Sequence, residues 1–139
     1  MFKRILVGFD GSKESLKALN LAINLAKFHG ASINALEVIE HMPVILEAYI
    51  KEDMLRDRER IIKHTEIIKR ISIENGIKID YEVVRGDPAV VLSKYAESED
   101  FDLIILGKRK LKGLKKLFME SVSSKVLDIS KKPVLVVKE

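Results

Sequence analysis

Short apolar runs alternate with longer amphipathic stretches along the chain. Aliphatic runs predict buried strands, and a run that alternates with polar residues predicts a half-exposed strand at a sheet edge. Apolar residues at three- and four-residue spacing predict helices between the strands. The predicted strands are 5–7, 32–39, 77–83, 102–106 and 134–137, and the predicted helices are 13–29, about 53–75, 88–97 and 121–129.

Capping residues support the predicted helix ends. Ser12 and Asp87 are suitable N-caps, and Pro88 suits the first position of a helix. Gly30 stands where a left-handed residue commonly ends a helix. Residues 41–51 show no regular pattern, so we predict no element there.

The second helix is long and strongly charged. Met54, Ile61 and Ile68 recur every seven residues and predict its buried stripe. All five residues of 56–60 are charged and predict a face that lies in solvent.

Strands that alternate with helices predict a parallel sheet with helices on both faces. No linker, repeat or low-complexity segment interrupts the pattern, so we expect residues 1–139 to form one doubly wound α/β domain with five strands. Ligands of such sheets bind beyond the carboxyl ends of the strands, where the strand order reverses.

The loops after the first and fourth predicted strands carry residues suited to an anion. Asp10 follows the first strand, Gly107 follows the fourth, and residues 108–116 hold six Lys or Arg residues and no acidic residue. Together with the Ser-rich helix start at 121–124, these are the parts of a phosphate site. The alternative is a solvated loop of lysines, with Asp10 and Ser12 serving only the turn and the helix cap.

The composition excludes several classes of protein. The 139 residues include no cysteine, which excludes disulfides, thiol catalysis and thiolate metal sites. No apolar window is long enough for a membrane helix and the start does not resemble a signal region, so we expect a cytoplasmic address without membrane contact. The net charge of +4 is low for a nucleic-acid binder, and no aromatic residue interleaves with the lysines of 108–116 for base stacking.

Motifs of the common α/β enzymes are absent from the sequence. It contains no phosphate-binding P-loop, no dinucleotide fingerprint and no nucleophile elbow. His29, His41 and His64 are scattered without metal-ligand spacing, so we expect them at the surface. We therefore predict no catalytic residues, no metal-binding residues and no enzymatic activity.

Five segments together resemble the universal stress protein family over the whole chain. They are 5–12, 86–88, 102–107, 121–123 and 132–137. The resemblance implies a sheet of order 3-2-1-4-5, which places the first and fourth strands side by side. It also implies a homodimer that pairs through the last strand, here Pro133, Val134, Leu135, Val136 and Val137.

The nucleotide-binding members of that family hold ATP phosphates with a pattern of Gly, two residues, Gly, nine residues, and Gly followed by Ser or Thr. By this resemblance Asp10 would contact the nucleoside end of ATP or its metal, and the backbone near Val38 would meet the adenine. Gly107 would be the first glycine of the pattern. The remaining candidate positions are Arg109, Lys110, Glu120, Ser121, Val122 and Ser123.

Two positions depart from the family pattern. Lys110 replaces the second glycine and adds bulk, although its ammonium could meet a phosphate. Glu120 replaces the third glycine and brings a carboxylate to the phosphate position. Two like charges about 4 Å apart repel by about 4 kcal/mol at an effective dielectric near 20.

These departures lead to two hypotheses. The first is a non-enzymatic, homodimeric stress-response regulator that acts through protein contacts, with weak or absent ATP binding. The alternative is a switch that binds ATP with Mg²⁺ through Asp10, Gly107, Lys110, Ser121 and Ser123.

Overall fold

The chain folds around a parallel sheet of five strands in the order β3-β2-β1-β4-β5. The computed structural model describes residues 1–40, 47–108 and 121–138, with only the backbone for 47–53. The predicted α/β class and strand order are both confirmed. The strands are β1 Arg4–Gly8, β2 Ser32–Ile39, β3 Ile79–Arg85, β4 Leu103–Gly107 and β5 Val134–Val137, and the helices are α1 Lys13–His29, α2 Glu47–Asn75, α3 Pro88–Ser98 and α5 Val122–Ile129.

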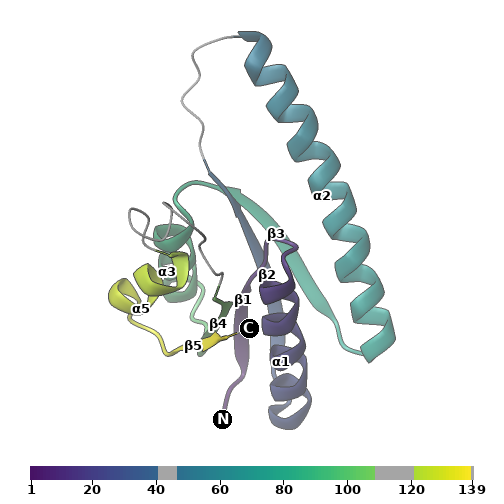
Figure 1. Ribbon diagram of the computed structural model, residues 1–139. Helices are drawn as coiled ribbons and strands as arrows, with labels where there is room; N and C mark the ends of the chain where they lie inside the picture. Colours follow the sequence, from purple (N-terminus) through teal and green to yellow (C-terminus); the bar gives the residue numbers. More distant parts are fainter. Residues whose placement is uncertain (41–46, 109–120, 139) are drawn as a thin grey trace.

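Helices cover both faces of the sheet. Figure 1 shows α1 and α2 on one side of the strands, and α3 and α5 on the other. Within β1, Ile5 and Val7 pack beneath α1, whereas Leu6 packs towards α3 and α5. All three residues are fully buried. The central strands are apolar on both faces because each face is covered, as expected for a parallel sheet.

The predicted helix caps form as the sequence indicated. The Ser12 hydroxyl accepts a hydrogen bond from the Ser15 amide at 3.2 Å, and the Asp87 carboxylate accepts one from the Val90 amide at 3.2 Å. Gly30 has a φ of +70° and ends α1. Among the described helices, none is both long and apolar enough to cross a membrane.

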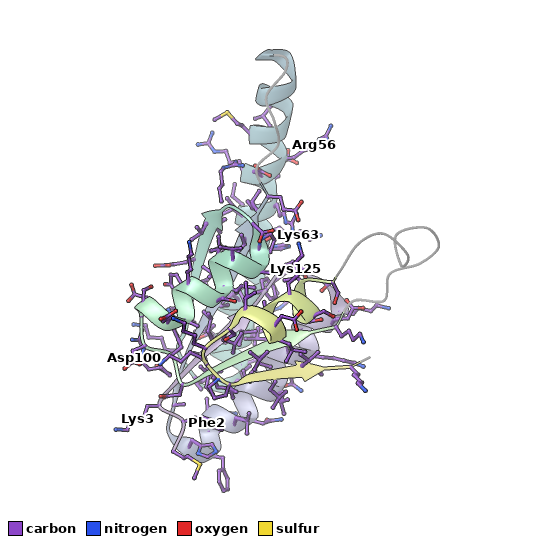
Figure 2. All side chains as sticks on the ribbon, turned by 90° about the vertical axis from the view of Figure 1, so that its left-hand side faces the viewer. Phe2, Lys3, Arg56, Lys63, Asp100 and Lys125 are labelled. Carbon is purple, nitrogen blue, oxygen red and sulfur yellow. The ribbon has the colours of Figure 1, made fainter. Side chains whose placement is uncertain are left out.

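Helix α2 differs most from the prediction, because it begins at Glu47 and not at residue 53. Its 29 residues span about 43 Å, whereas the seven residues of β3 span about 23 Å. The first part of α2, which carries Arg56, therefore extends beyond the sheet (Figures 1 and 2). Met54 was predicted to be buried but is 60% exposed for this reason, whereas Ile68 is 3% exposed.

Gly107 ends β4 where the first turn of α1 crosses it. A Cβ atom at this position would lie 2.3 Å from the backbone oxygen of Glu14 and 2.4 Å from its carbonyl carbon. Backbone atoms cannot swing aside as a side chain can, so the packing of α1 on β4 requires glycine here.

Asp102 joins the beginnings of β4 and β1. Its Oδ2 accepts hydrogen bonds from the backbone amides of Lys3 at 2.6 Å and Arg4 at 2.8 Å. The hydrogen bond from Arg4, followed by that from Lys3, lowers the pKa of Asp102 below its ordinary value. The charged carboxylate therefore stabilises the folded state.

We predict that Asp102→Asn lowers the free energy of unfolding by about 1 kcal/mol at pH 7. Because folding lowers the pKa of Asp102, its contribution is present above pH 3.8 and is lost as the pH falls through the folded-state pKa. Urea unfolding should therefore show a smaller difference in the free energy of unfolding between Asp102→Asn and the unchanged protein at pH 2.5 than at pH 7. Asp80→Asn is the control, because Asp80 is exposed and its ion pair with Lys78 is long, at 3.7 Å, and therefore weak. An equal loss for Asp102→Asn at both pH values would contradict the account.

We predict that Gly107→Ala lowers the free energy of unfolding by about 3 kcal/mol, because the new methyl group collides with the backbone of α1. Gly76→Ala is the matched control. Gly76 has a φ of +62° and open space around it, so alanine there should cost only about 1 kcal/mol of backbone strain. Equal losses in a denaturant titration would show that contact with α1 does not restrict position 107.

Candidate functional site

A cavity of about 550 Å³ opens at the carboxyl ends of β1, β2 and β4. The carboxyl ends of these strands, the turn after β1 and the first turns of α1, α3 and α5 line it. β1 lies between β2 and β4, and the chain reverses its direction of travel across the sheet at this point. The cavity thus lies where doubly wound sheets bind their ligands.

The structure brings most of the predicted site residues together around this cavity. Those that line it are Asp10, Val38, Gly107, Ser121, Val122 and Ser123. Arg109, Lys110 and Glu120 lie outside the described residues, and their roles stay predictions. Binding by any of these residues also stays a prediction.

The turn after β1 is built around Asp10. Its Oδ1 accepts a hydrogen bond from the Ser12 amide at 2.9 Å, which closes the turn. Gly11 between them has a φ of +83°, a conformation that glycine adopts without strain. Asp10 therefore organises the turn, and it also lines the cavity.

The end of β2 offers backbone groups to the cavity. The oxygen of Leu36 faces β1, because it accepts a hydrogen bond from the Phe9 amide at 2.9 Å. Backbone groups in a strand alternate sides, so the N–H and C=O of Val38 face the same way as those of Leu36. The β1 pairing ends at Gly8 with Leu36, and the groups of Val38 thus lie beyond it.

Hydroxyl groups gather at the start of α5. Ser121 is the N-cap, and its Oγ accepts a hydrogen bond from the Ser124 amide at 3.2 Å. The same Oγ lies 3.2 Å from the Ser123 Oγ and 2.8 Å from the Ser124 Oγ. The partial positive charge of a helix N-terminus and nearby hydroxyls favour a negatively charged ligand group. Lys125 also lines the cavity and adds a cation.

A buried glutamate with its polar partners, beside the cavity, was not predicted from the sequence. Glu37 of β2 is fully buried. Its Oε2 accepts a hydrogen bond from Arg60 Nε at 2.7 Å, and its Oε1 lies 2.5 Å from His64 Nδ1. The Tyr81 hydroxyl donates to Oε1 at 2.7 Å. Burial, followed by this hydrogen bond to Glu37, raises the pKa of Tyr81 well above its ordinary value.

One further expectation about α2 is therefore wrong. His64 is not at the surface but 7% exposed, because its ring pairs with the carboxylate of Glu37 and packs edge-on against Phe9. Arg60 lies on the predicted solvent face, with its side chain 45% exposed, but it also bonds to Glu37 and lines the cavity. One signal could have revealed the cluster, namely a glutamate between Leu36 and Val38 in the apolar second half of a predicted strand.

A metal site among the described residues would need several side chains that could hold the ion together. Within residues 1–40, 47–108 and 121–138, no group of three or more acidic or histidine side chains is placed to hold a metal ion.

Comparison with known proteins agrees with the fold and with the sequence motifs. The model of the universal stress protein family matches residues 1–138. Universal stress protein YxiE of Bacillus subtilis (strain 168) is 32% identical over 99% of this chain and 100% of its own length. The solved structure of MJ0577, a protein whose biochemical function was assigned from its structure, has a TM-score of 0.85 at 31% identity and covers 100% of this chain and 97% of that one. A universal stress protein solved in complex with cAMP has a TM-score of 0.77 at 24% identity, with coverage of 98% and 97%. This chain belongs to the universal stress protein family.

Proposed function

We propose that the protein is a non-enzymatic regulatory homodimer whose cavity holds the nucleoside part of an adenine nucleotide and binds ATP weakly. One observation carries the proposal. The residues expected at the nucleoside end, Asp10 and Val38, line the same cavity as the start of α5, while Lys110 and Glu120 occupy the two later glycine positions of the phosphate pattern.

The nucleoside end of the cavity has the chemistry that a purine needs. Leu36, Val38 and Leu92 line it with apolar groups. The backbone N–H and C=O of Val38 supply a donor and an acceptor in fixed positions, which can form hydrogen bonds with the edge of a base. The related protein that binds cAMP makes an adenine nucleotide the natural class of ligand to test.

The phosphate end supports weak binding of a triphosphate. Glu120 directly precedes Ser121, the N-cap of α5, in the sequence, and a negative charge next to the helix start would oppose the attraction of that start for phosphate. The hydroxyls of Ser121 and Ser123 and the cation of Lys125 favour the alternative, an ATP-binding switch. The charge on Glu120 therefore decides between the two.

The proposed homodimer rests on β5, the last strand of the sheet. The carbonyl oxygens of Pro133 and Val137 accept hydrogen bonds from the backbone of the β4 segment at 2.9 and 2.8 Å. Because backbone groups alternate sides, the N–H and C=O of Val134 and Val136 face the outer edge. This edge can pair with β5 of a second copy.

We predict that Glu120→Gln tightens ATP binding at least tenfold, because the substitution removes a like charge and keeps the size of the side chain. Isothermal titration calorimetry with ATP and Mg²⁺ measures the change. Adenosine is the control ligand, since it lacks phosphate and should bind both proteins equally. Lys110→Gly combined with Glu120→Gly should bind ATP at least as tightly as Glu120→Gln.

Two results would contradict the proposed function. Unchanged ATP affinity in both variants would show that Glu120 does not weaken phosphate binding. Stoichiometric ATP in an acid extract of the purified protein would overturn weak binding and favour the ATP-binding switch.

We predict that the protein has the mass of two chains by light scattering at micromolar concentration, and that Val136→Pro reduces it to one. Proline removes the outward N–H of Val136 and leaves the hydrogen bonds to β4 in place. Val136→Thr keeps that N–H and is the matched control. A single-chain mass for the unchanged protein would count against the dimer.

A further inference from the structure

The buried carboxylate of Glu37 requires partners, and they come from outside its own strand. Arg60 and His64 are on α2, and Tyr81 is on β3. Such a group is strongly unfavourable in the interior unless several donors satisfy it. The contacts of Glu37 therefore fix where this part of α2 lies against the end of β2.

His64 extends this cluster to the turn after β1. A Cβ atom built on Gly11 would lie only 2.4 Å from His64 Nε2, and Gly11 has a φ of +83°. The ring of His64 thus lies directly against the turn, with Phe9 packed edge-on at 5.3 Å between centroids. Its other nitrogen, Nδ1, is held by Glu37.

Arg60 reaches the same turn from the cavity side. Its Nε donates to Glu37, and its Nη2 donates to the backbone oxygen of Asp10 at 3.4 Å. Its side chain is 45% exposed and lines the cavity. One residue of α2 thus connects the buried acid, the turn and the space where a ligand would lie.

Other contacts already hold α2 to the domain. Ile68 of α2 is buried in the core, and Ile67 and Ile71 pack against the same core cluster. Asp57 forms a second ion pair with Arg85 at 2.5 Å. A buried ionic cluster commonly adds little net stability over an apolar one, and in some proteins it specifies geometry instead. The cluster is therefore better explained by what it positions than by what it stabilises.

We propose that Glu37, Arg60 and His64 form a positioning cluster through which α2 fixes the turn Asp10–Gly11–Ser12 at the edge of the cavity. The turn holds its shape only while α2 is seated, so ligand affinity depends on that seating. The part that concerns ligand affinity rests on the proposed function, whereas the part that concerns the turn does not.

The test measures the Ser12 amide, which closes the turn through its hydrogen bond to Asp10. Hydrogen exchange of this amide, followed by NMR, should be at least tenfold faster in Arg60→Gln than in the unchanged protein. Arg85→Gln is the matched control, because it breaks the other arginine–carboxylate pair of α2 and should change this exchange less than twofold. Equal exchange in Arg60→Gln and the unchanged protein would overturn the proposal.

Two further variants separate positioning from packing at His64. His64→Gln keeps a donor for Glu37 and should preserve protection of the Ser12 amide, whereas His64→Leu fills space without a donor and should lose it. Equal protection of the Ser12 amide in the two variants would show that His64 only fills space, and would overturn its positioning role. The thermal stability of both variants is measured as well, so that a loss of protection caused by overall destabilisation is distinguished from a local effect on the turn.

The dependence of ligand affinity on the cluster is tested with AMP. Its affinity should fall at least tenfold in Arg60→Gln and stay unchanged in Arg85→Gln. An equal fall in both variants would overturn the link between the cluster and the ligand. If the unchanged protein binds no AMP at millimolar concentration, the proposed function fails, while the exchange of the Ser12 amide still decides whether the cluster positions the turn.

Discussion

A carboxylate buried inside β2 determines how helix α2 lies against the sheet. Arg60 and His64 are one helical turn apart, and both reach Glu37. This is possible only if one face of α2 lies over the end of β2. The interaction therefore sets the rotation of a helix whose first turns extend beyond the sheet (Figure 1). It also brings the guanidinium group of Arg60 into the wall of the cavity.

The cavity itself follows from the topology. In the order β3-β2-β1-β4-β5, the ends of β1 and β4 are neighbours, so the turn after β1 and Gly107 at the end of β4 line the same cavity. Gly107 is the one glycine of the family's phosphate pattern that this chain keeps, and the backbone of Glu14 requires it for packing. Its presence is therefore no argument for ATP. By the resemblance, the chain keeps the glycine that its fold needs, and Lys110 and Glu120 stand at the two other glycine positions of that pattern.

The fold could be predicted because its signals are local. Apolar runs, helical periodicity and the caps Ser12 and Asp87 each lie within a few residues of the element they define. The start of α2 was missed, since residues 47–53 show no regular apolar pattern. Where α2 extends past the sheet, Met54 and Leu55 are 60% and 59% exposed, and an exposed segment needs no apolar pattern.

The candidate site could be predicted only where it is built from loops at strand ends. Asp10, Val38 and Gly107 follow from the strand pattern and the family resemblance. The link between Glu37 and His64 spans 27 positions and joins a strand to a helix. Periodicity cannot show such a pair, because it reports which face of an element is buried and not what that face meets.

Nucleoside binding in the cavity is the central claim, and an NMR titration of the ¹⁵N-labelled protein with AMP tests it most directly. The account predicts saturable shifts of the Ser12, Val38 and Gly107 amides, which lie around one cavity. The amides of Ala31 and Asp102, at the opposite ends of the strands, should not move. Shifts confined to that opposite end, or no shifts at millimolar AMP, would contradict the claim.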